Sequence, residues 1–342
     1  MTSSSSVGER IPHAYATYFD SGYLSRGLTL IEGLRAFGDD ADVWVMCLDD
    51  ASREFLDGLD DPSIHTLAIA DLEASEPRLL DVRSGRSRME YVFTCTPLLL
   101  RHVMRAQGDT RTVVTYLDAD LGFFADPLLV HRRLGEGSVG IIEHRYPPRL
   151  ARRLGKYGRF NVGWVGIRAD AAGFECVDWW SERCIEWCFD TPSEGRYADQ
   201  GYLDEFPSRF AGVVVLPDAG FDVAPWNTGR HVLSRSSDGT VVVDHADPLV
   251  FFHFHGIKRR GRWFVTSQLV YRSPMRRVLR RDVYVPYLER LDHWDAVLAS
   301  KITPVVARRG KGLRGLAFNV ARGLLDLGSI LSGNAIRSRR PG

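Results

Sequence analysis

Short apolar runs alternate with amphipathic stretches along most of the chain. The runs suit buried strands, and the stretches between them carry apolar residues at helical spacing. Strands are predicted at 13–19, 42–48, 65–70, 112–117, 138–142, 161–167, 213–216 and 241–252. Helices are predicted at 25–38, 51–59, 87–107, 170–189 and 198–206. Strands separated by helices of this length predict an α/β fold, with a mostly parallel sheet covered by helices on both faces.

The most apolar predicted strand, TVVTYL (112–117), leads straight to two carboxylates, Asp118 and Asp120. In open parallel sheets the functional residues lie beyond the carboxyl ends of the strands. Both side chains are therefore placed to lean toward one cation. Oxygen ligands favour a hard divalent ion such as Mg²⁺ or Mn²⁺, which commonly bridges to phosphates. A solvated pair of loop acids would give the same pattern.

A second signal lies far downstream, in PLVFFHFHGIK (248–258). His253 and His255 are two residues apart on an apolar strand, so their imidazoles point to the same face. Imidazole accepts Mn²⁺ readily and Mg²⁺ less so. Gly256 would let the backbone approach a phosphate, and Lys258 would supply a point charge for it. A single strand histidine is more often a core residue, but two beside Gly and Lys favour a site.

Four segments, in this order, resemble motifs of the retaining, nucleotide-sugar-dependent glycosyltransferases of the GT-A fold. The resemblance is to family 8, the group of glycogenin and the bacterial lipooligosaccharide galactosyltransferases, and it covers about residues 13–258. The segments are YLDAD (116–120) for the Asp-x-Asp motif, RFNVGWVGIR (159–168) for the Asn-x-Gly strand, YADQGYLDEF (197–206) for the Asp-Gln helix start, and HFHGIK (253–258) for the His-x-x-Gly-x-x-Lys motif. The resemblance implies a Rossmann-like GT-A sheet and the transfer of a hexose from a nucleotide-diphosphate sugar, with a UDP-sugar favoured.

The resemblance also assigns residues to a metal site for Mn²⁺ or Mg²⁺. Asp118, Asp120 and His253 match the metal ligands, and His255 is the alternative histidine. The spacing from His253 to Gly256 fits the family, whereas Lys258 follows His253 by five residues instead of six. We therefore expect a divergent member of the group.

The donor's other parts are assigned by chemistry and by motif. The expected contacts are Tyr18, Phe19 and Asp49 for the base and ribose, Gly256 and Lys258 for the diphosphate, and Asn161, Asp199 and Gln200 for the sugar. Asp199 and Gln200 are the candidates for the catalytic group beneath the anomeric carbon. The family's Arg-Leu pair is replaced here by RSRMEYVFTCTP (86–97), which leaves the role of Arg86 or Arg88 open. Trp226 would serve as a sugar platform or pack on the core.

Composition sets the broad class. The chain has 342 residues, 44% hydrophobic and 25% charged, which is typical of a globular protein. The five cysteines are an odd number, which argues against a disulfide framework, and no signal peptide or membrane span is recognised. A cytoplasmic protein is expected, held peripherally at the inner face of the membrane if the basic end binds there.

The net charge of +1 hides two unlike parts. Residues 256–342 carry 19 Lys+Arg and 5 Asp+Glu, whereas residues 1–255 have a net charge of −13. This predicts a GT-A catalytic domain at 1–258 and a basic, mainly helical extension at 259–342. Apolar residues in the extension fall on one face of a predicted amphipathic helix: Leu313, Leu316, Ala317, Val320, Leu324, Leu327 and Leu331. Such a helix suits an anionic membrane surface, while a nucleic-acid partner is disfavoured because no recognisable module with interleaved aromatics is present.

Two other functions fit parts of the pattern. A catalytically inactive, membrane-docked carbohydrate-binding or scaffold protein would keep the fold and lose the chemistry. A phosphohydrolase would use LDADLG (117–122) as an aspartyl nucleophile motif, but that motif normally follows the first strand of its domain, and here it follows the fourth. The acceptor of a transferase is expected to be a glycan, lipid-linked or otherwise.

Overall fold

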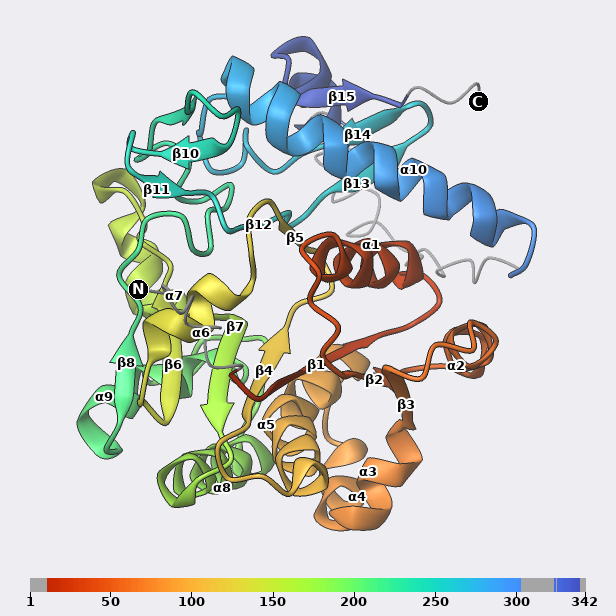
Figure 1. Ribbon diagram of the computed structural model, residues 1–342, viewed down its shortest axis with the longest axis vertical. Helices are drawn as coiled ribbons and strands as arrows, with labels where there is room; N and C mark the ends of the chain where they lie inside the picture. The colour runs from red at the N-terminus through yellow and green to blue at the C-terminus, as the bar shows by residue number, and fades with distance from the viewer. Residues whose placement is uncertain (1–10, 303–322, 324, 339–342) are drawn as a thin grey trace, which may run out of the picture.

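The computed structural model describes residues 11–302, 323 and 325–338, and its centre is a seven-stranded sheet (Figure 1). The strand order is β3-β2-β1-β4-β7-β6-β8. The strands are β1 (His13–Phe19), β2 (Val43–Cys47), β3 (Ile64–Ala68), β4 (Val113–Leu117), β6 (Val139–Glu143), β7 (Phe160–Arg168) and β8 (Val213–Val215). All neighbouring pairs are parallel except the two that involve β7. The predicted α/β fold with a mostly parallel sheet is confirmed.

Helices cover both faces of this sheet (Figure 1). One layer contains α3 (Ile69–Ser75), α4 (Arg78–Arg83), α5 (Arg88–Gln107) and α8 (Ala171–Glu186); the other contains α1 (Leu24–Arg35), α2 (Asp50–Asp57) and α6 (Leu128–Leu134). Successive side chains along a strand point to opposite faces of the sheet, so each strand contributes to the hydrophobic core on both faces. Ala14 and Ala16 of β1 belong to the core beneath α5, whereas Tyr15 and Phe19 belong to the core beneath α1.

Local sequence signals explain where two of these helices begin. Ser87 and Glu90 form a capping box at the start of α5, in which each side chain accepts a hydrogen bond from the other residue's backbone N–H. Asp49 caps α2, its carboxylate accepting from Ser52 N–H at 2.9 Å. Helices α2 and α5 therefore start within a residue of the predicted positions.

The predicted strand at 241–252 is wrong. That stretch forms three short strands, β10 (Val241–Val243), β11 (Asp247–Pro248) and β12 (Phe251–His253). The chain turns between the first two at Asp244 and His245, both with positive φ angles of 51° and 63°. β10 pairs with β11 and with β9 (Leu233–Arg235) in a small antiparallel sheet. The uninterrupted apolar pattern concealed this turn.

A different pairing brings the end of this stretch to the strand that follows β4, in a separate two-stranded sheet. β12 runs antiparallel to β5 (Leu121–Phe123), with His253 opposite Leu121. Because β5 begins one residue after Asp120, this register sets His253 beside the two carboxylates. Short helical turns lie at the same edge: η1 (Pro148–Arg153), α7 (Leu154–Tyr157) and η2 (Gln200–Glu205), which leads into α9 (Phe206–Arg209). The helix predicted at 198–206 is thus a 3₁₀ turn followed by α9.

The C-terminal segment packs over α1 and β12. It contains β13 (Lys258–Arg260), β14 (Trp263–Val265), a π-helix (Leu279–Tyr284), α10 (Val285–Ala299) and β15 (Ala335–Arg337). Trp294 Nε1 of α10 donates to Glu32 Oε2 of α1 at 3.0 Å, and the rings of Tyr287 and Phe254 stack with centroids 3.6 Å apart. β13, β14 and β15 form a three-stranded sheet that the sequence did not predict.

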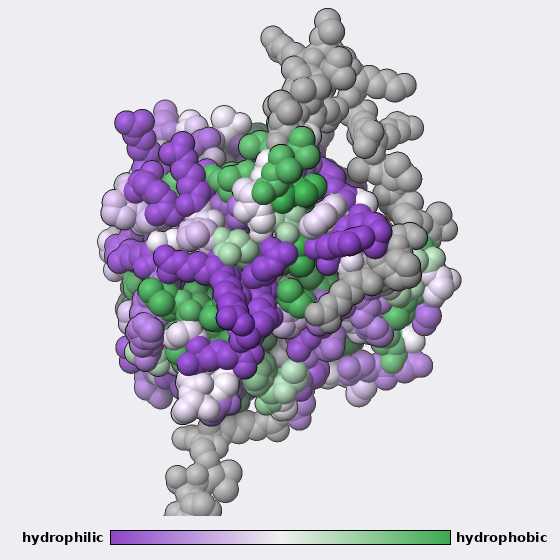
Figure 2. All heavy atoms as spheres, turned by 90° about the horizontal axis from the view of Figure 1, so that it is seen from above, coloured by the Kyte–Doolittle hydropathy of each residue, from purple (hydrophilic) through white to green (hydrophobic). Residues whose placement is uncertain are grey.

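Most of the predicted amphipathic helix, Leu313 to Val320 together with Leu324, lies outside the described residues. Residues 325–331 are helical and expose Leu325, Leu327 and Leu331, the last by 80%. On the face seen from above in Figure 2, polar side chains surround separate apolar patches. None of the helices described is long and apolar enough to span a bilayer.

Candidate functional site

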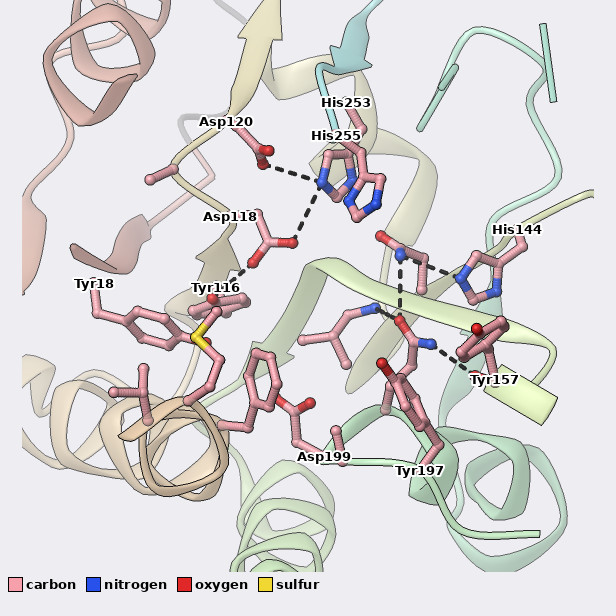
Figure 3. A pocket seen from close by; sticks show the side chains of 18 of the residues that line it. Tyr18, Tyr116, Asp118, Asp120, His144, Tyr157, Tyr197, Asp199, His253 and His255 are labelled. Carbon is pink, nitrogen blue, oxygen red and sulfur yellow. Dashed lines mark hydrogen bonds and ion pairs between the residues drawn. The ribbon is translucent and has the colours of Figure 1, made fainter. Parts of the chain in front are cut away.

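A cavity of about 480 Å³ opens at the carboxyl ends of β1 and β4 (Figure 3). β7 runs antiparallel to β4, so its amino-terminal end reaches the same edge and adds Asn161 and Val162 to the wall. Further lining residues come from the loop after β2, the N-terminal part of α5, η2 and the residues around β12, and from the segments that carry His144, Arg153, Tyr157, Trp226 and Tyr271. This volume lies in the range of pockets that hold small ligands.

Asp118, Asp120 and His253 converge on one point of the cavity wall (Figure 3). One ligand atom from each lies within 4.8 Å of the other two. His253 Nε2 is 3.5 Å from Asp118 Oδ2 and 3.1 Å from Asp120 Oδ1. Two carboxylate oxygens and one imidazole nitrogen fit Mn²⁺ and, less well, Mg²⁺. His255 lines the cavity but does not join this cluster, so the geometry favours His253 as the third ligand.

The charges in this cluster depend on each other. Burial, opposed by His253, raises the pKa of Asp118, and the Asp120 carboxylate adds to the increase. Burial also works against ionised Asp120, but the charge and hydrogen bond of His253 hold its pKa below the usual range. Burial would favour neutral His253, yet Asp120, Asp222 and Asp118 raise the pKa of this imidazole well above its usual value. The arrangement therefore calls for a positive charge between the two carboxylates.

Asp222 lies behind the histidine, on the side away from the carboxylates. Its side chain is 1% exposed, and its Oδ1 is 3.5 Å from His253 Nδ1. Neither carboxylate oxygen has a conventional hydrogen-bond partner among the described residues. A carboxylate at Nδ1 favours the tautomer that presents Nε2 to a metal. Nothing in the sequence marked Asp222, because it is a lone acid in a loop.

Gly163 leaves the space that His253 occupies. A Cβ built on Gly163 would lie 2.7 Å from His253 Nδ1 and 2.5 Å from Asn161 Oδ1. The Gly163 carbonyl also accepts a hydrogen bond from Asp118 N–H at 2.9 Å. This glycine of the Asn-x-Gly segment thus allows β7, the metal-site aspartate and the histidine to approach closely.

Asn161, Asp199 and Gln200 all line the cavity. Gln200 Oε1 accepts from Asn161 Nδ2 at 3.2 Å, and its Nε2 donates to the Tyr157 carbonyl at 2.7 Å. Asp199 is 4% exposed, and its Oδ2 is buried without a hydrogen-bond partner in the described chain. Burial raises the pKa of Asp199 to about 7. The sequence analysis had assigned these three residues to the same part of the donor, and all three line the cavity.

The residues predicted for the nucleoside divide into two groups. Tyr18 and Phe19 line the cavity at the end of β1, together with Asp20, which the sequence analysis did not single out. Asp49 does not line it: its carboxylate accepts from Ser21 Oγ at 2.6 Å in addition to capping α2. Arg88 pairs with Asp20 at 3.0 Å.

Three other predicted residues also lie outside the cavity lining. Arg86 donates to Thr94 Oγ1 and to the Ile185 carbonyl, so it joins α5 to α8. Gly256, with φ 75°, forms the turn after β12, where a Cβ would lie 3.2 Å from Ser267 Oγ. Lys258 begins β13 and is exposed.

Aromatic rings form the wall beyond the metal cluster. Trp226 is 3% exposed, and its ring lies edge-on to His253 at a centroid distance of 5.1 Å and to Tyr271 at 6.0 Å. The sequence analysis left two roles open for Trp226, a sugar platform or packing on the core. The structure is consistent with both, because Trp226 lines the cavity and also belongs to a small core cluster. Tyr157 and Tyr271 lie in the same wall, and no motif had pointed to them.

The fold and this cavity define an α/β protein with a candidate divalent-cation site at the carboxyl edge of its main sheet. No protein-family model matches the chain. Two uncharacterized proteins of Bacillus subtilis (strain 168) are similar to the chain in sequence. YfnF is 32% identical over 254 residues, which cover 72% of this chain and 82% of YfnF. YfnD is 30% identical over 283 residues, which cover 82% of this chain and 89% of YfnD. The chain belongs to the family of YfnF and YfnD.

Solved structures give weaker likenesses. Mouse xyloside xylosyltransferase 1 aligns with 72% of this chain and 98% of its own, at 11% identity and a TM-score of 0.45. The glycosyltransferase GlyE of Streptococcus pneumoniae TIGR4 aligns with 87% of this chain and 66% of its own, at 15% identity and a TM-score of 0.45. Scores below 0.5 do not assign a function, which must be inferred from the cavity itself.

Proposed function

We propose that this protein is a metal-dependent, retaining glycosyltransferase of the GT-A type, similar to family 8. It would transfer a hexose from a nucleotide-diphosphate sugar, with a UDP-sugar favoured, to a glycan or lipid-linked acceptor. One observation carries the proposal: the Asp118–Asp120–His253 cluster shares one cavity with aromatic side chains at the end of β1 and with the amide and carboxyl groups of Asn161, Asp199 and Gln200.

Asp118, Asp120 and His253 would hold Mn²⁺ or Mg²⁺. The bound ion would supply electrostatic neutralisation of the leaving diphosphate. His253 is kept in place by Asp222 on one side and by the close approach of Gly163 on another. Lys258, at the exposed beginning of β13, would add a second positive charge on the diphosphate, with Gly256 allowing the turn that carries it.

The nucleoside would occupy the side formed by the end of β1. Tyr18 and Phe19 offer aromatic surface for the base, and Asp20 offers a carboxylate for the ribose hydroxyls. Asp49, first expected in that role, supports this loop from behind through Ser21.

The hexose would then lie between the metal cluster and η2. During transfer the bond from the anomeric carbon to the diphosphate oxygen breaks, and a bond to the acceptor hydroxyl oxygen forms on the same face. In a front-face reaction the hydroxyl proton passes to the departing diphosphate, and the Asp199 carboxylate stabilises positive charge at the anomeric carbon. In a double displacement Asp199 instead attacks that carbon first. Gln200, held by three hydrogen bonds, would orient the sugar.

The test is a donor screen with the full chain. Purified protein with Mn²⁺ is incubated with UDP-, GDP-, TDP- and CMP-sugars, and nucleotide release is followed with and without glycan acceptors. We expect turnover of one class, lost in Asp120→Asn and retained in Asp81→Asn, an exposed change on α4. Full turnover in EDTA would contradict the metal role. Release of inorganic phosphate from simple phosphate esters would favour the phosphohydrolase, and sugar binding without any turnover would favour the inactive scaffold.

We also propose that the C-terminal segment contacts an anionic membrane. The exposed leucines at 325, 327 and 331 support this, because they lie in the part of the chain with the excess of Lys and Arg. An apolar face bordered by cations is typical of peripheral membrane attachment.

A further inference from the structure

A short stretch beside the cavity carries four cations, which we call the cationic segment: Arg149, Arg152, Arg153 and Lys156. It forms η1 and α7, and none of the residues in these two turns is buried. Among the residues that the structure describes, no carboxylate lies within ion-pair distance of any of the four. About half of the other arginines that the structure describes do have such partners, including Arg159 just after the segment, which pairs with Glu143.

The contacts that the cationic segment makes are with neutral groups. The Arg153 guanidinium lies 4.7 Å from the centroid of the Tyr271 ring, and Lys156 Nζ lies 4.8 Å from that of Tyr157. Arg149 Nη2 donates to the Arg272 carbonyl and to Ser273 Oγ, each at 3.4 Å. Aromatic faces and carbonyls orient a cation without neutralising it. The segment therefore keeps its full positive charge for a ligand.

The position of the segment relates it to the proposed reaction. A row of contacts leads from the candidate metal ligand His253 to the segment. The His253 and Trp226 ring centroids are 5.1 Å apart, and those of Trp226 and Tyr271 are 6.0 Å apart. The Arg153 guanidinium lies over the Tyr271 ring. Arg153, Tyr157 and Tyr271 all line the cavity. Tyr157 lies on the opposite side of Asp118 from Tyr18 (Figure 3). The nucleoside side and the cationic segment are thus separated by the metal cluster.

This order along the cavity indicates what the segment binds. The donor's diphosphate would lie at the metal cluster and its hexose at η2, so the space next to Tyr157 and Tyr271 remains for the acceptor. The tyrosine rings offer surface on which a sugar can stack, and arginine forks match the oxygens of a phosphate.

We propose that the acceptor is a phosphorylated saccharide, whose phosphate binds the cationic segment while its sugar ring lies against Tyr157 and Tyr271. This inference rests on the proposed function, since it assigns the acceptor of that reaction. The phosphate could belong to a soluble sugar phosphate or to a lipid-linked sugar, because both present the same oxygens.

The first test measures binding, independently of turnover. The full chain is saturated with UDP and Mg²⁺, so that phosphate cannot enter the donor site. Saturation-transfer NMR then compares glucose, galactose and N-acetylglucosamine with their 6-phosphates. We expect at least one phosphate to bind about tenfold or more tightly than its parent sugar, and this preference to weaken with salt. The preference should disappear in Arg152→Gln/Lys156→Gln and persist in Arg132→Gln/Arg133→Gln, a matched pair of exposed arginines on α6.

A second arm separates the two sources of phosphate. Phosphatidylcholine vesicles carrying polyprenyl-phosphate-linked glucose are compared with plain phosphatidylcholine vesicles in flotation assays, using the same variants. Binding to the former alone, lost in the Arg152/Lys156 variant, identifies a lipid-linked acceptor; preference for the soluble phosphates identifies a soluble one. The proposal is overturned if no phosphate is preferred in either arm, or if the Arg152/Lys156 variant keeps the preference. Donor hydrolysis without acceptor reports on the proposed function separately, since it needs no acceptor site.

Discussion

Replacing Asp199 by Asn should stabilise the fold while reducing the proposed transferase activity by more than about tenfold. An unperturbed Asp ionises near pH 3.9, whereas burial raises the pKa of Asp199 to about 7. Between these values the folded state keeps a proton that the unfolded state has lost, so unfolding releases a proton and stability falls as pH rises. The difference of about three pKa units, at about 1.36 kcal/mol each, corresponds to a loss of about 4 kcal/mol in the free energy of unfolding. This loss is complete above pH 7. Asn carries no such cost.

The measurement is the free energy of unfolding in urea at pH 4.5 and pH 8.5, with EDTA present so that metal binding does not contribute. We expect Asp199→Asn to gain little at pH 4.5 and about 4 kcal/mol at pH 8.5, where its melting temperature should rise by roughly 6 °C. Nucleotide-sugar turnover should fall by more than about tenfold, because an amide cannot stabilise the developing positive charge. Asp81→Asn, exposed on α4, is the control. A gain that is equal at both pH values, or equal to that of the control, would refute the reasoning.

Three further changes test other parts of the structure. Gly163→Ala should cost about 1–3 kcal/mol of stability. It should also weaken Mn²⁺ binding, measured by electron paramagnetic resonance, because a Cβ would displace His253. The control Gly85→Ala should change neither quantity, because the nearest atom to its Cβ would be 3.7 Å away. Asp222→Asn should weaken Mn²⁺ binding about 10- to 100-fold, because His253 would lose the carboxylate that orients it. The control Asp218→Asn should leave the affinity unchanged. An unchanged affinity in Asp222→Asn as well would show that the Asp222 carboxylate does not act on the imidazole. Changing Leu325, Leu327 and Leu331 to Ser should reduce sedimentation with anionic liposomes without affecting transfer to a soluble acceptor; equal sedimentation of both proteins would argue against membrane contact. Deleting the end of the chain would be a poorer test, since β15 pairs with β14.

The elements that the sequence predicted well are those whose own residues determine them. β4 is a run of fully buried residues, and α5 has a capping box at one end and Gly108 at the other. The strand predicted at 241–252 failed because apolar residues continue through the turn at Asp244, where the side chain accepts from Val232 N–H and so replaces a strand partner. β5 was missed because three residues carry no periodicity, and only the arrival of β12 makes them a strand.

The same distinction applies to the site. Asp118, Asp120 and His253 stand in patterned segments, and the structure brings them together. Asp222 and Arg153 do not stand out in the sequence, because their place in the cavity depends on loops that meet only after folding. Asp49 illustrates the opposite case: a polar residue at a strand end looked like a ligand contact, and local hydrogen bonds to Ser21 and Ser52 take up its carboxylate.

The pairing of β5 with β12 has a consequence for synthesis in the cell. The ribosome releases the two carboxylates long before it releases His253, because Leu121 and its partner on β12 are far apart in the chain. A nascent chain that has completed β4 therefore displays Asp118 and Asp120 without their imidazole. The candidate cation site is complete only when β12, which ends at His253, has left the exit tunnel and has added to β5. Under the proposed function, a chain interrupted before β12 would carry both acids without the imidazole that completes the candidate cation site.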